Sequence, residues 1–452
     1  MTPDTLNRRD FIATAAVTAL AWSPERLLAQ ARRPNMLFIL ADDLGYGDLS
    51  AFGRPDYRTP NIDRLITEGV RFTNAYAAAS TCTPTRVAFL TGRYPQRLAP
   101  ELQRPMGWGT REAGLPKYGL SPSHPTLPTL LKRAGYRTAL VGKWHLGFMP
   151  EFSPNRHGFD EFFGIHGGGA DYFTHTGPAG QQDLWENEVP AERIGYMTDL
   201  LSERAGELIG RRHDRPFYLS LHYTAPHWPW EGPADRHGTD PQHHFVDGGS
   251  QRVFAEMMRS LDDGVGRILA ALKRAGLERD TLVVLTSDNG GERFSYNWPW
   301  TNGKFTLWEG GIRVPLTMRW PGRLPRGGAT DQLAISMDLT ATLLAAASAS
   351  PDPAYPLDGI DLLPFARGER TSTERTLCWR QPYPDQTPHA AARRANWKYL
   401  RVGDEEQLFD LGVDPGEKAN LKARRADVFE RLRDEWRTWD AQMVPLQGPA
   451  AR

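Results

Sequence analysis

Four short apolar segments, far apart in the chain, limit its fold more than any other feature. They cover residues 36–41, 139–141, 217–221 and 282–286. Near-continuous apolar runs of this length are expected of strands that are buried on both faces of a parallel sheet. Stretches with helical spacing lie between them, as in sheets whose strands are joined by crossover helices. The sequence therefore predicts an α/β fold with a large, mostly parallel sheet sandwiched by helices.

Three helices are predicted from their start and stop signals. Thr59-Pro60 offers an N-cap followed by proline at the first helical position, and Gly69 is the expected stop. Thr83-Pro84 repeats this signature, with Gly92 as the stop. Apolar spacing over residues 251–275 predicts a longer helix.

The pattern changes towards the C-terminus. Residues 397–401 and 407–411 are predicted to be paired strands, and residues 424–442 a terminal amphipathic helix. We therefore predict a large domain over residues 32–325. A small α+β subdomain, with an antiparallel sheet and the terminal helix, is predicted over residues 326–452.

Residues 1–31 are typical of an export signal. Arg8-Arg9 precede an apolar run over residues 11–21, which is shorter than the ~20 residues needed to span a bilayer. Ala29-Gln30-Ala31 follows as a cleavage site. The paired arginines resemble a bacterial twin-arginine signal. We predict an exported bacterial protein, periplasmic or secreted, with no membrane span; the alternative is an ordinary amphipathic N-terminal helix.

Charge excludes one class of function. Lys+Arg and Asp+Glu each number 54, so the formal net charge is +0 at pH 7. A chain without net positive charge lacks the broad basic field of a general nucleic-acid binder. The chain holds two cysteines, Cys82 and Cys378, which excludes a disulfide scaffold.

Each apolar segment leads into polar residues. The first is followed by Asp42-Asp43, the second by Lys143 and His145, the third by His227, and the fourth by Asp288-Asn289. Ligands of open α/β sheets bind outside the carboxyl ends of the strands. We therefore expect acids, an amide and bases to meet at one edge of the sheet.

The acids and the amide form a candidate metal site. Asp42, Asp43, Asp288 and Asn289 offer only hard oxygen ligands, which select Ca²⁺ or Mg²⁺ over zinc or copper. The alternative is that each aspartate caps the helix or turn that follows it.

The segment T-C-T-P-T-R-V-A-F-L-T-G, residues 81–92, is predicted to bind an oxyanion. Cys82 is placed just before a helix with Thr83 as its N-cap, where free amides and the helix dipole favour an anion. Arg86, one turn into the helix, adds a bidentate donor. A plain thiolate nucleophile would fit this description equally.

Cys82-Thr83-Pro84-Thr85-Arg86, followed by Leu90-Thr91-Gly92, resembles the signature of the type I, formylglycine-dependent sulfatases of the alkaline phosphatase superfamily. The resemblance covers nearly all of the chain after the signal and is closest to the arylsulfatase and N-acetylgalactosamine-sulfatase branch. Further matching segments, in order, are Asp42-Asp43, G-K-W-H-L-G at 142–147, A-P-H at 225–227, S-D-N-G at 287–290, Gly303-Lys304 and W-E-G-G-I-R-V-P at 308–315. One departure, Thr301-Asn302-Gly303-Lys304 in place of the commoner Arg-Gly-Gly-Lys, bears on substrate preference.

The resemblance implies an alkaline phosphatase-like fold and a sulfuric ester hydrolase of the arylsulfatase type. The substrates would be sulfated carbohydrates and aryl sulfates. A formylglycine-generating enzyme would convert Cys82 to formylglycine during maturation. One Ca²⁺ per chain, in preference to Mg²⁺, would be held by Asp42, Asp43, Cys82, Asp288 and Asn289.

The resemblance also implies roles for the catalytic residues. These are Cys82, Arg86, Lys143, His145, His227 and Lys304. Arg86 and Lys143 would hold the formylglycine and the sulfate oxygens. His227 or Lys304 would protonate the released alcohol, and His145 would take a proton from the formylglycine hydrate.

Candidate substrate contacts are less specific. Lys143, His227 and Lys304 would also bind the substrate, and aromatic and polar side chains nearby suit a sugar. The further candidates are Asp171, His175, Trp228, Trp230 and Trp300. Ordinary loop packing is the alternative for each of them.

Two other functions stay open. A phosphodiesterase or phosphonate monoester hydrolase of the same superfamily would share the fold and the formylglycine. A glycan-binding protein without activity would lack the nucleophile or a metal ligand, and none of these is missing from the sequence.

Overall fold

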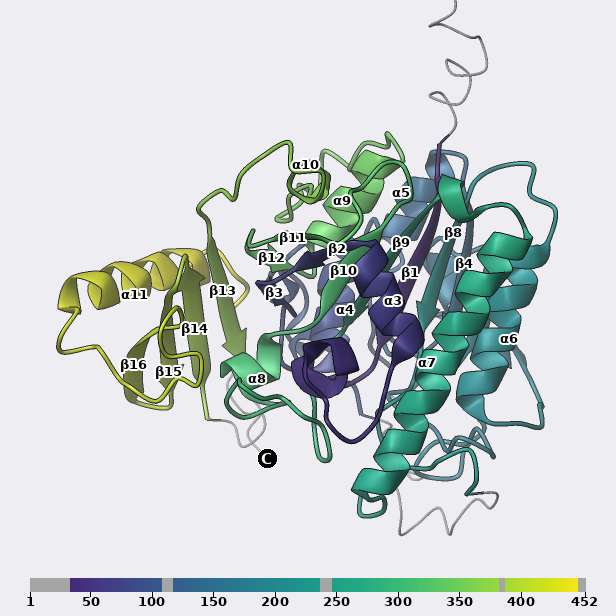
Figure 1. Cartoon of the computed structure of the whole chain (residues 1–452), viewed down its shortest axis with the longest axis horizontal. Helices are drawn as coiled ribbons and strands as arrows, with labels where there is room; N and C mark the ends of the chain where they lie inside the picture. Colours follow the sequence, from purple (N-terminus) through teal and green to yellow (C-terminus); the bar gives the residue numbers. More distant parts are fainter. Residues whose placement is uncertain (1–32, 108–116, 236–245, 382–386, 446–452) are drawn as a thin grey trace, which may run out of the picture.

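The computed structural model describes residues 33–107, 117–235, 246–381 and 387–445. The predicted export signal, residues 1–31, lies outside the described residues. The chain forms a large α/β unit, beside which a small antiparallel sheet carries one long helix (Figure 1). Among the described residues, no helix is long and apolar enough to cross a membrane.

The large unit is built on a ten-stranded sheet. The neighbours β9, β1, β8, β4 and β5 are parallel, and antiparallel strands flank them. This confirms the predicted mostly parallel α/β sheet. From edge to edge the strands are β11 (Gly328–Thr330), β2 (Val70–Phe72), β10 (Leu316–Arg319), β9 (Thr281–Ser287), β1 (Asn35–Ala41), β8 (Phe217–His222), β4 (Arg137–Gly142), β5 (Glu161–Gly164), β6 (Trp185–Glu186) and β7 (Val189–Pro190).

Helices cover both faces of the sheet because the central strands are apolar on both faces. In β1, Leu37 and Ile39 pack into one core while Met36 and Phe38 pack into the other, as the two-residue period of a strand requires. The first core holds α3 (Pro60–Glu68), α6 (Met197–Gly210) and α7 (Gln251–Arg274). The second holds α4 (Cys82–Thr91), α5 (Leu127–Arg133), α9 (Asp338–Ala346) and α10 (Leu363–Ala366).

Helix α4 begins earlier than the sequence predicts. Thr81, and not Thr83, occupies the N-cap position, so Cys82 is the first residue of the helix. The Thr83 hydroxyl is not available as a cap, because it donates to the His145 carbonyl (3.2 Å) and accepts from the Met106 amide (3.0 Å). Gly92 ends the helix with a φ of 68°, as predicted.

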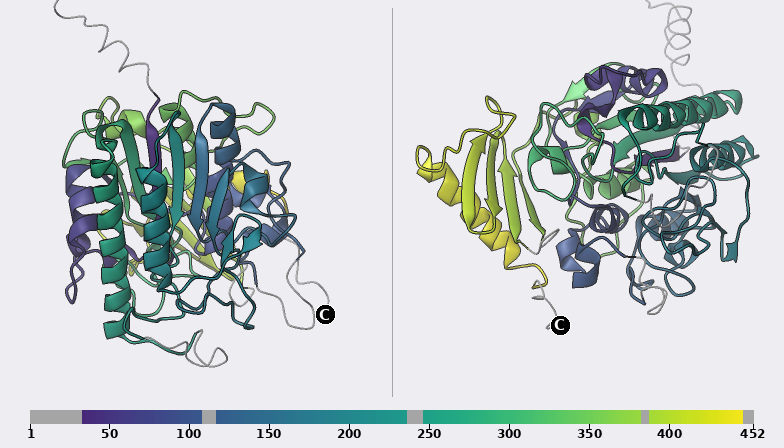
Figure 2. Two further views of the ribbon diagram at one scale, coloured as in Figure 1. Left: turned by 90° about the vertical axis from the view of Figure 1, so that its right-hand side faces the viewer. Right: turned by 90° about the horizontal axis from the view of Figure 1, so that it is seen from below.

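The small sheet is antiparallel and contains β13 (Thr376–Gln381), β14 (His389–Arg394), β15 (Trp397–Val402) and β16 (Glu405–Asp410). Helix α11 (Ala426–Asp440) packs across the face that points away from the large unit (Figure 2). The predicted strand pair and terminal helix are thus confirmed.

The segment between the two units belongs with the large sheet. Strand β11 pairs with β2, and α9 and α10 pack into the second core. The domain boundary after residue 325 stays a prediction, and this packing favours a later one. The shorter elements are β3 (Ala75–Tyr76), β12 (Ala334–Ile335), α8 (Glu309–Ile312) and the 3₁₀ turns Tyr46–Asp48, Ser50–Phe52, Pro95–Arg97, Pro100–Gln103, Pro154–His157 and Glu278–Asp280.

Candidate active site

The carboxyl ends of four parallel strands bring the predicted polar residues together. Backbone hydrogen bonds join the segments beyond the strands: the Asp42 amide donates to Ala225 (3.2 Å), the Asp288 amide to Ala41 (3.2 Å), and the Lys143 amide to His222 (2.9 Å). The residues predicted to be catalytic or metal-binding are all buried. They are Asp42, Asp43, Cys82, Arg86, Lys143, His145, His227, Asp288, Asn289 and Lys304.

The acids form a cluster that suits a cation. Asp42, Cys82 and Asp288 each offer a ligand atom, and these atoms lie within 4.8 Å of one another. Asn289 donates through Nδ2 to Asp43 (2.7 Å). The buried oxygens Oδ1 of Asp42 and Oδ1 of Asn289 accept no hydrogen bond. Buried oxygens without donors are costly unless a cation satisfies them, so the donor set fits Ca²⁺ or Mg²⁺.

Each carboxylate of the cluster also faces a basic side chain. Lys143 Nζ lies 2.6 Å from Asp42, and Arg86 lies 2.9 Å from Asp288. Burial, followed by repulsion from Asp288, raises the pKa of Asp42 well above its usual value. The site is therefore a compact array of paired acidic and basic side chains.

Lys304 forms the third buried ion pair of the site. Its Nζ lies 2.6 Å from Asp43 and 3.1 Å from Glu292. Burial disfavours its ammonium, but attraction to Asp43 and Glu292 outweighs burial and raises the pKa of Lys304. Lys304 is therefore a charged ammonium whose proton is held tightly by its two carboxylate partners.

The two histidines are neutral by environment. His145 donates from Nε2 to the Met106 carbonyl (2.8 Å), and its buried Nδ1 has no hydrogen-bond partner. Burial, together with Lys143, lowers the pKa of His145 well below its usual value. His227 donates from Nδ1 to the Trp228 carbonyl (2.5 Å), which leaves Nε2 at 3.7 Å from Asp43. Burial, then Lys304, lowers the pKa of His227 in the same way. Each ring keeps one nitrogen able to accept a proton.

Cys82 does not suit a plain thiolate nucleophile. It is 3% exposed, and burial raises the pKa of its thiol. Nucleophilic cysteines instead have lowered pKa values. Cys82 is the first residue of α4 and lies beside Asp42 and Asp288.

Arg86 faces the protein and not an open cavity. Its guanidinium donates to Asp288 (Nε, 3.0 Å) and to the Lys143 carbonyl (2.8 Å), and it is 0% exposed. This geometry fixes Asp288 and the end of β4. Direct contact of Arg86 with a sulfate stays a prediction.

Two further polar residues, Glu292 and His222, lie in the site and were not predicted from the sequence. Glu292, which contacts Lys304, lies three residues after Asn289, and burial raises its pKa. Its carboxylate adds a negative charge beside Lys304. His222 ends β8 and lies with Nδ1 3.0 Å from the Lys143 carbonyl. The only feature of the sequence that could have identified His222 as a site residue is its position at the end of an apolar strand.

The predicted sugar contacts have structural partners of their own. Asp171 accepts from the Thr174 amide (2.6 Å), and His175 Nε2 lies 3.1 Å from the Gly195 carbonyl. Trp230 is buried against Phe294, and Arg313 lies 3.8 Å above the Trp300 ring. These contacts agree with loop packing for those four residues. Trp228 lies beside His227, with ring centroids 4.3 Å apart and the ring planes tilted by 37°.

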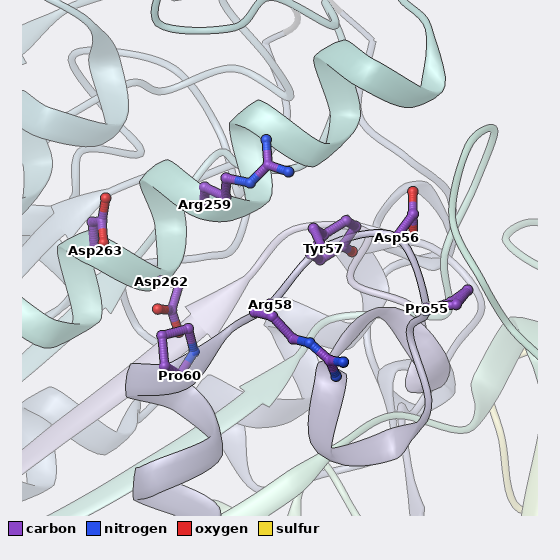
Figure 3. A pocket seen from close by; sticks show the side chains of 8 residues that line it. All are labelled: Pro55, Asp56, Tyr57, Arg58, Pro60, Arg259, Asp262 and Asp263. Carbon is purple, nitrogen blue, oxygen red and sulfur yellow. The ribbon is translucent and has the colours of Figure 1, made fainter.

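A separate pocket lies between the start of α3 and the middle of α7 (Figure 3). Asp262, in its wall, accepts from the Ile62 amide (2.8 Å) and so caps α3. The pocket contains none of the predicted site residues. It is lined by Pro55, Asp56, Tyr57, Arg58, Pro60, Arg259, Asp262 and Asp263.

Known proteins resemble the chain over most of its length. The Sulfatase family model matches residues 34–349, and a model described as N-sulphoglucosamine sulphohydrolase, C-terminal, matches residues 297–442. Arylsulfatase A of Homo sapiens is 34% identical, over 87% of this chain and 84% of its own length. N-acetylgalactosamine-6-sulfatase of Homo sapiens is 37% identical, over 88% of this chain and 83% of its own length. The crystal structure of Ps i-CgsB in complex with k-i-k-neocarrahexaose superposes with a TM-score of 0.82 at 30% identity, covering 92% of this chain and 94% of that one.

Proposed function

The chain belongs to the sulfatase family as a type I sulfatase of the alkaline phosphatase superfamily, and we propose that it releases sulfate by means of a formylglycine made from Cys82. It is a sulfuric ester hydrolase, which confirms the resemblance found in the sequence. One observation carries the finer proposal: Cys82 meets Asp42 and Asp288 in a buried cluster with ligand atoms within 4.8 Å of one another.

Calcium is the proposed cation. Asp42, Asp43, Asp288 and Asn289 would hold it together with the modified side chain at position 82, and the unsatisfied oxygens of Asp42 and Asn289 support this assignment. When present, the ion polarises a sulfate oxygen and the formylglycine hydrate supplies the nucleophilic hydroxyl.

The remaining steps are assigned to side chains of this chain. Lys143 and Lys304 would balance the negative charge of the bound sulfate ester. Lys304 carries a proton at Nζ and is assigned to protonate the departing alcohol, because burial and Lys304 lower the pKa of His227 and leave that ring neutral. The ion pairs of Lys304 raise its own pKa, so the proton would pass only to a strongly basic acceptor such as the alkoxide of a sugar. His145 would accept a proton from the formylglycine hydrate at Nδ1, the nitrogen that makes no hydrogen bond.

Sulfated carbohydrates are the proposed natural substrates, with aryl sulfates as convenient probes. Two observations support this class. The chain is 37% identical to an N-acetylgalactosamine-6-sulfatase, and its fold matches that of Ps i-CgsB, which was solved with k-i-k-neocarrahexaose.

Export is proposed from the N-terminal signal alone. The protein would act in the periplasm or outside the cell, after a formylglycine-generating enzyme has modified Cys82. Replacement of Arg8-Arg9 by two lysines should leave the protein in the cytoplasm if the twin-arginine route is used. Continued export of that variant would contradict the route.

Two measurements test the function. Mass spectrometry of the tryptic peptide 72–86 from a host that co-expresses the modifying enzyme should show Cys82 converted. A sulfate-release panel should show activity on 4-nitrophenyl sulfate and on a 4- or 6-sulfated N-acetylgalactosamine or a sulfated galactan. The Cys82→Ala variant should retain less than about a tenth of the rate. Full activity with unmodified Cys82 would disprove the formylglycine, and faster cleavage of an aryl phosphate diester would favour the phosphodiesterase.

A further inference from the structure

Gln381 reaches from the small sheet into the catalytic unit. It is the last residue of β13, the strand of that sheet nearest the large unit (Figure 1). The Ser80 hydroxyl donates to its Oε1 (2.6 Å), and its Nε2 donates to the Phe305 carbonyl (2.7 Å). Ser80 lies two residues before Cys82, and Phe305 directly follows Lys304. The side-chain amide of Gln381, a residue that is 4% exposed, therefore contacts the segment that carries Cys82 and the segment that carries Lys304.

The two segments also bond to each other. The Phe305 amide donates to the Ser80 carbonyl (3.0 Å), and the Lys304 amide donates to Gly291 (3.0 Å). Gln381 thus closes a ring of hydrogen bonds, in which both backbone polar groups of Phe305 have a fixed partner.

Phe305 needs these partners because its backbone is strained. Its φ is 72°, in the left-handed region that a residue with a bulky side chain rarely adopts. Such a conformation is unfavourable for a bulky residue and persists only when neighbouring contacts impose it. If the carbonyl lost its donor, the turn would relax. The preceding residue, Lys304, would then lose its alignment with Asp43 and Glu292.

We propose that Gln381 is a positioning residue, which holds the turn that carries Lys304 against the turn that carries Cys82. The small C-terminal sheet then completes the active site and does more than cover the large unit. This proposal rests on the functions proposed above for Cys82 and Lys304.

The test compares two buried glutamines. Gln381→Met keeps the volume of the side chain and removes both hydrogen bonds. The control is Gln332→Met: Gln332 is 0% exposed, donates to Leu333 (3.0 Å) and accepts from the Thr373 amide (2.7 Å). Both variants are examined as the full, modified chain, with thermal melts followed by circular dichroism. Activity is measured as sulfate release from a sulfated sugar that the wild type cleaves, because a sugar alkoxide needs a proton to depart, and it is normalised to the folded fraction.

Gln381→Met should lower kcat about tenfold, because the proton transfer assigned to Lys304 occurs only in the transition state. KM should rise by a smaller factor, because Lys304 also balances the charge of the bound sulfate. Gln332→Met should keep kcat within about twofold of the wild type. Ser80→Ala, a milder change, should lower kcat about threefold. The double variant Ser80→Ala/Gln381→Met should lose less than the product of the single losses, since both act on one ring.

The proposal is overturned if Gln381→Met has the wild-type kcat, or if its effect is confined to KM. It is also overturned if Gln381→Met and Gln332→Met lose kcat equally, or if the loss in the double variant equals the product of the two single losses. Cys82→Ala is measured in the same assay. If Cys82→Ala is inactive while Gln381→Met is fully active, the positioning role alone is wrong; if Cys82→Ala is active, the proposed chemistry is wrong.

Discussion

At the residue scale, Lys304 offers the sharpest test of the charges in the site. Its Nζ neutralises Asp43 (2.6 Å) and Glu292 (3.1 Å). Lys304→Met keeps most of the volume but removes the ammonium from both carboxylates, of which Asp43 is a proposed ligand of the cation. Calcium affinity should therefore rise, while kcat should fall by about 100-fold or more. Calorimetric calcium titration and sulfate release from a sulfated sugar, whose alkoxide needs a proton to depart, measure the two effects.

The control for that variant is a surface lysine. Lys132, 51% exposed in its side chain, pairs with Asp160. Lys132→Met should leave calcium affinity and kcat within about twofold, since exposed ion pairs contribute little. Weaker calcium binding by Lys304→Met would contradict the placement of Asp43 at the cation.

Glu231 gives the fold a pH dependence of its own. Burial, followed by repulsion from Asp171, raises its pKa from the ordinary 4.5 to about 8. Between these two pH values the folded chain holds a proton that the unfolded chain has lost. Glu231 therefore contributes its full share to the free energy of unfolding below about pH 4.5. That contribution falls as the pH rises to about 8, by at most about 1.4 kcal/mol per pH unit.

Replacing Glu231 by glutamine should remove this slope. The amide resembles the protonated acid and keeps an acceptor for the Tyr172 amide (2.9 Å in the wild type). Melting temperatures between about pH 5 and pH 8 should decline less in Glu231→Gln than in the wild type. The exposed Glu207→Gln is the control and should follow the wild type. Parallel curves for Glu231→Gln and the wild type would contradict the shift.

The sequence predicted individual site residues where a strong pattern surrounded them. Asp42, Asp43 and Asp288 follow apolar strands, so their meeting at one edge could be foreseen. Glu292 could not, because its partner Lys304 lies twelve residues further along an irregular loop. Contacts made through such loops depend on a path that no periodicity describes.

At the scale of elements, the glycine loop 167–169 supports both histidines. A Cβ placed on Gly168 would lie 2.8 Å from Cε1 and Nε2 of His145, and one on Gly169 would lie 3.2 Å from the His227 ring. Gly168→Ala should therefore displace His145 and lower kcat by about tenfold or more. Gly206→Ala in α6, where a Cβ meets nothing within 4 Å, is the control and should keep full activity. Steady-state kinetics compare the two, and an unchanged kcat in Gly168→Ala would contradict the packing.

Element boundaries were predictable where only local chemistry decides them. Gly92 ends α4 as expected, because glycine enters the left-handed region without strain. The start of α4 was predicted wrongly, since the Thr83 hydroxyl bonds to His145 and Met106 from other parts of the chain. Tertiary contacts therefore decide which threonine caps the helix.

At the scale of the whole molecule, the sequence predicted two units but not how they join. The paired strands of the small sheet follow from local alternation. The contact of Gln381 with Ser80 spans about 300 residues of sequence. Trp379 makes a similar link, donating to the Ala77 carbonyl (2.8 Å). Contacts between residues so far apart in the chain depend on how the surfaces of the two folded units pack together. No local pattern in the sequence predicts such contacts.

Calcium should stabilise the whole molecule, because a cation that binds only the folded site shifts the unfolding equilibrium. At 100 times its dissociation constant the gain is about 2.7 kcal/mol, which raises the melting temperature by several degrees. Asp288→Asn should lose most of this calcium-dependent rise. Asp338→Asn is the control: Asp338 is equally buried and pairs with Arg375 (2.7 Å), so its variant should melt earlier yet keep the full rise. Scanning calorimetry with calcium or with a chelator measures both, and a full rise in Asp288→Asn would place the cation elsewhere.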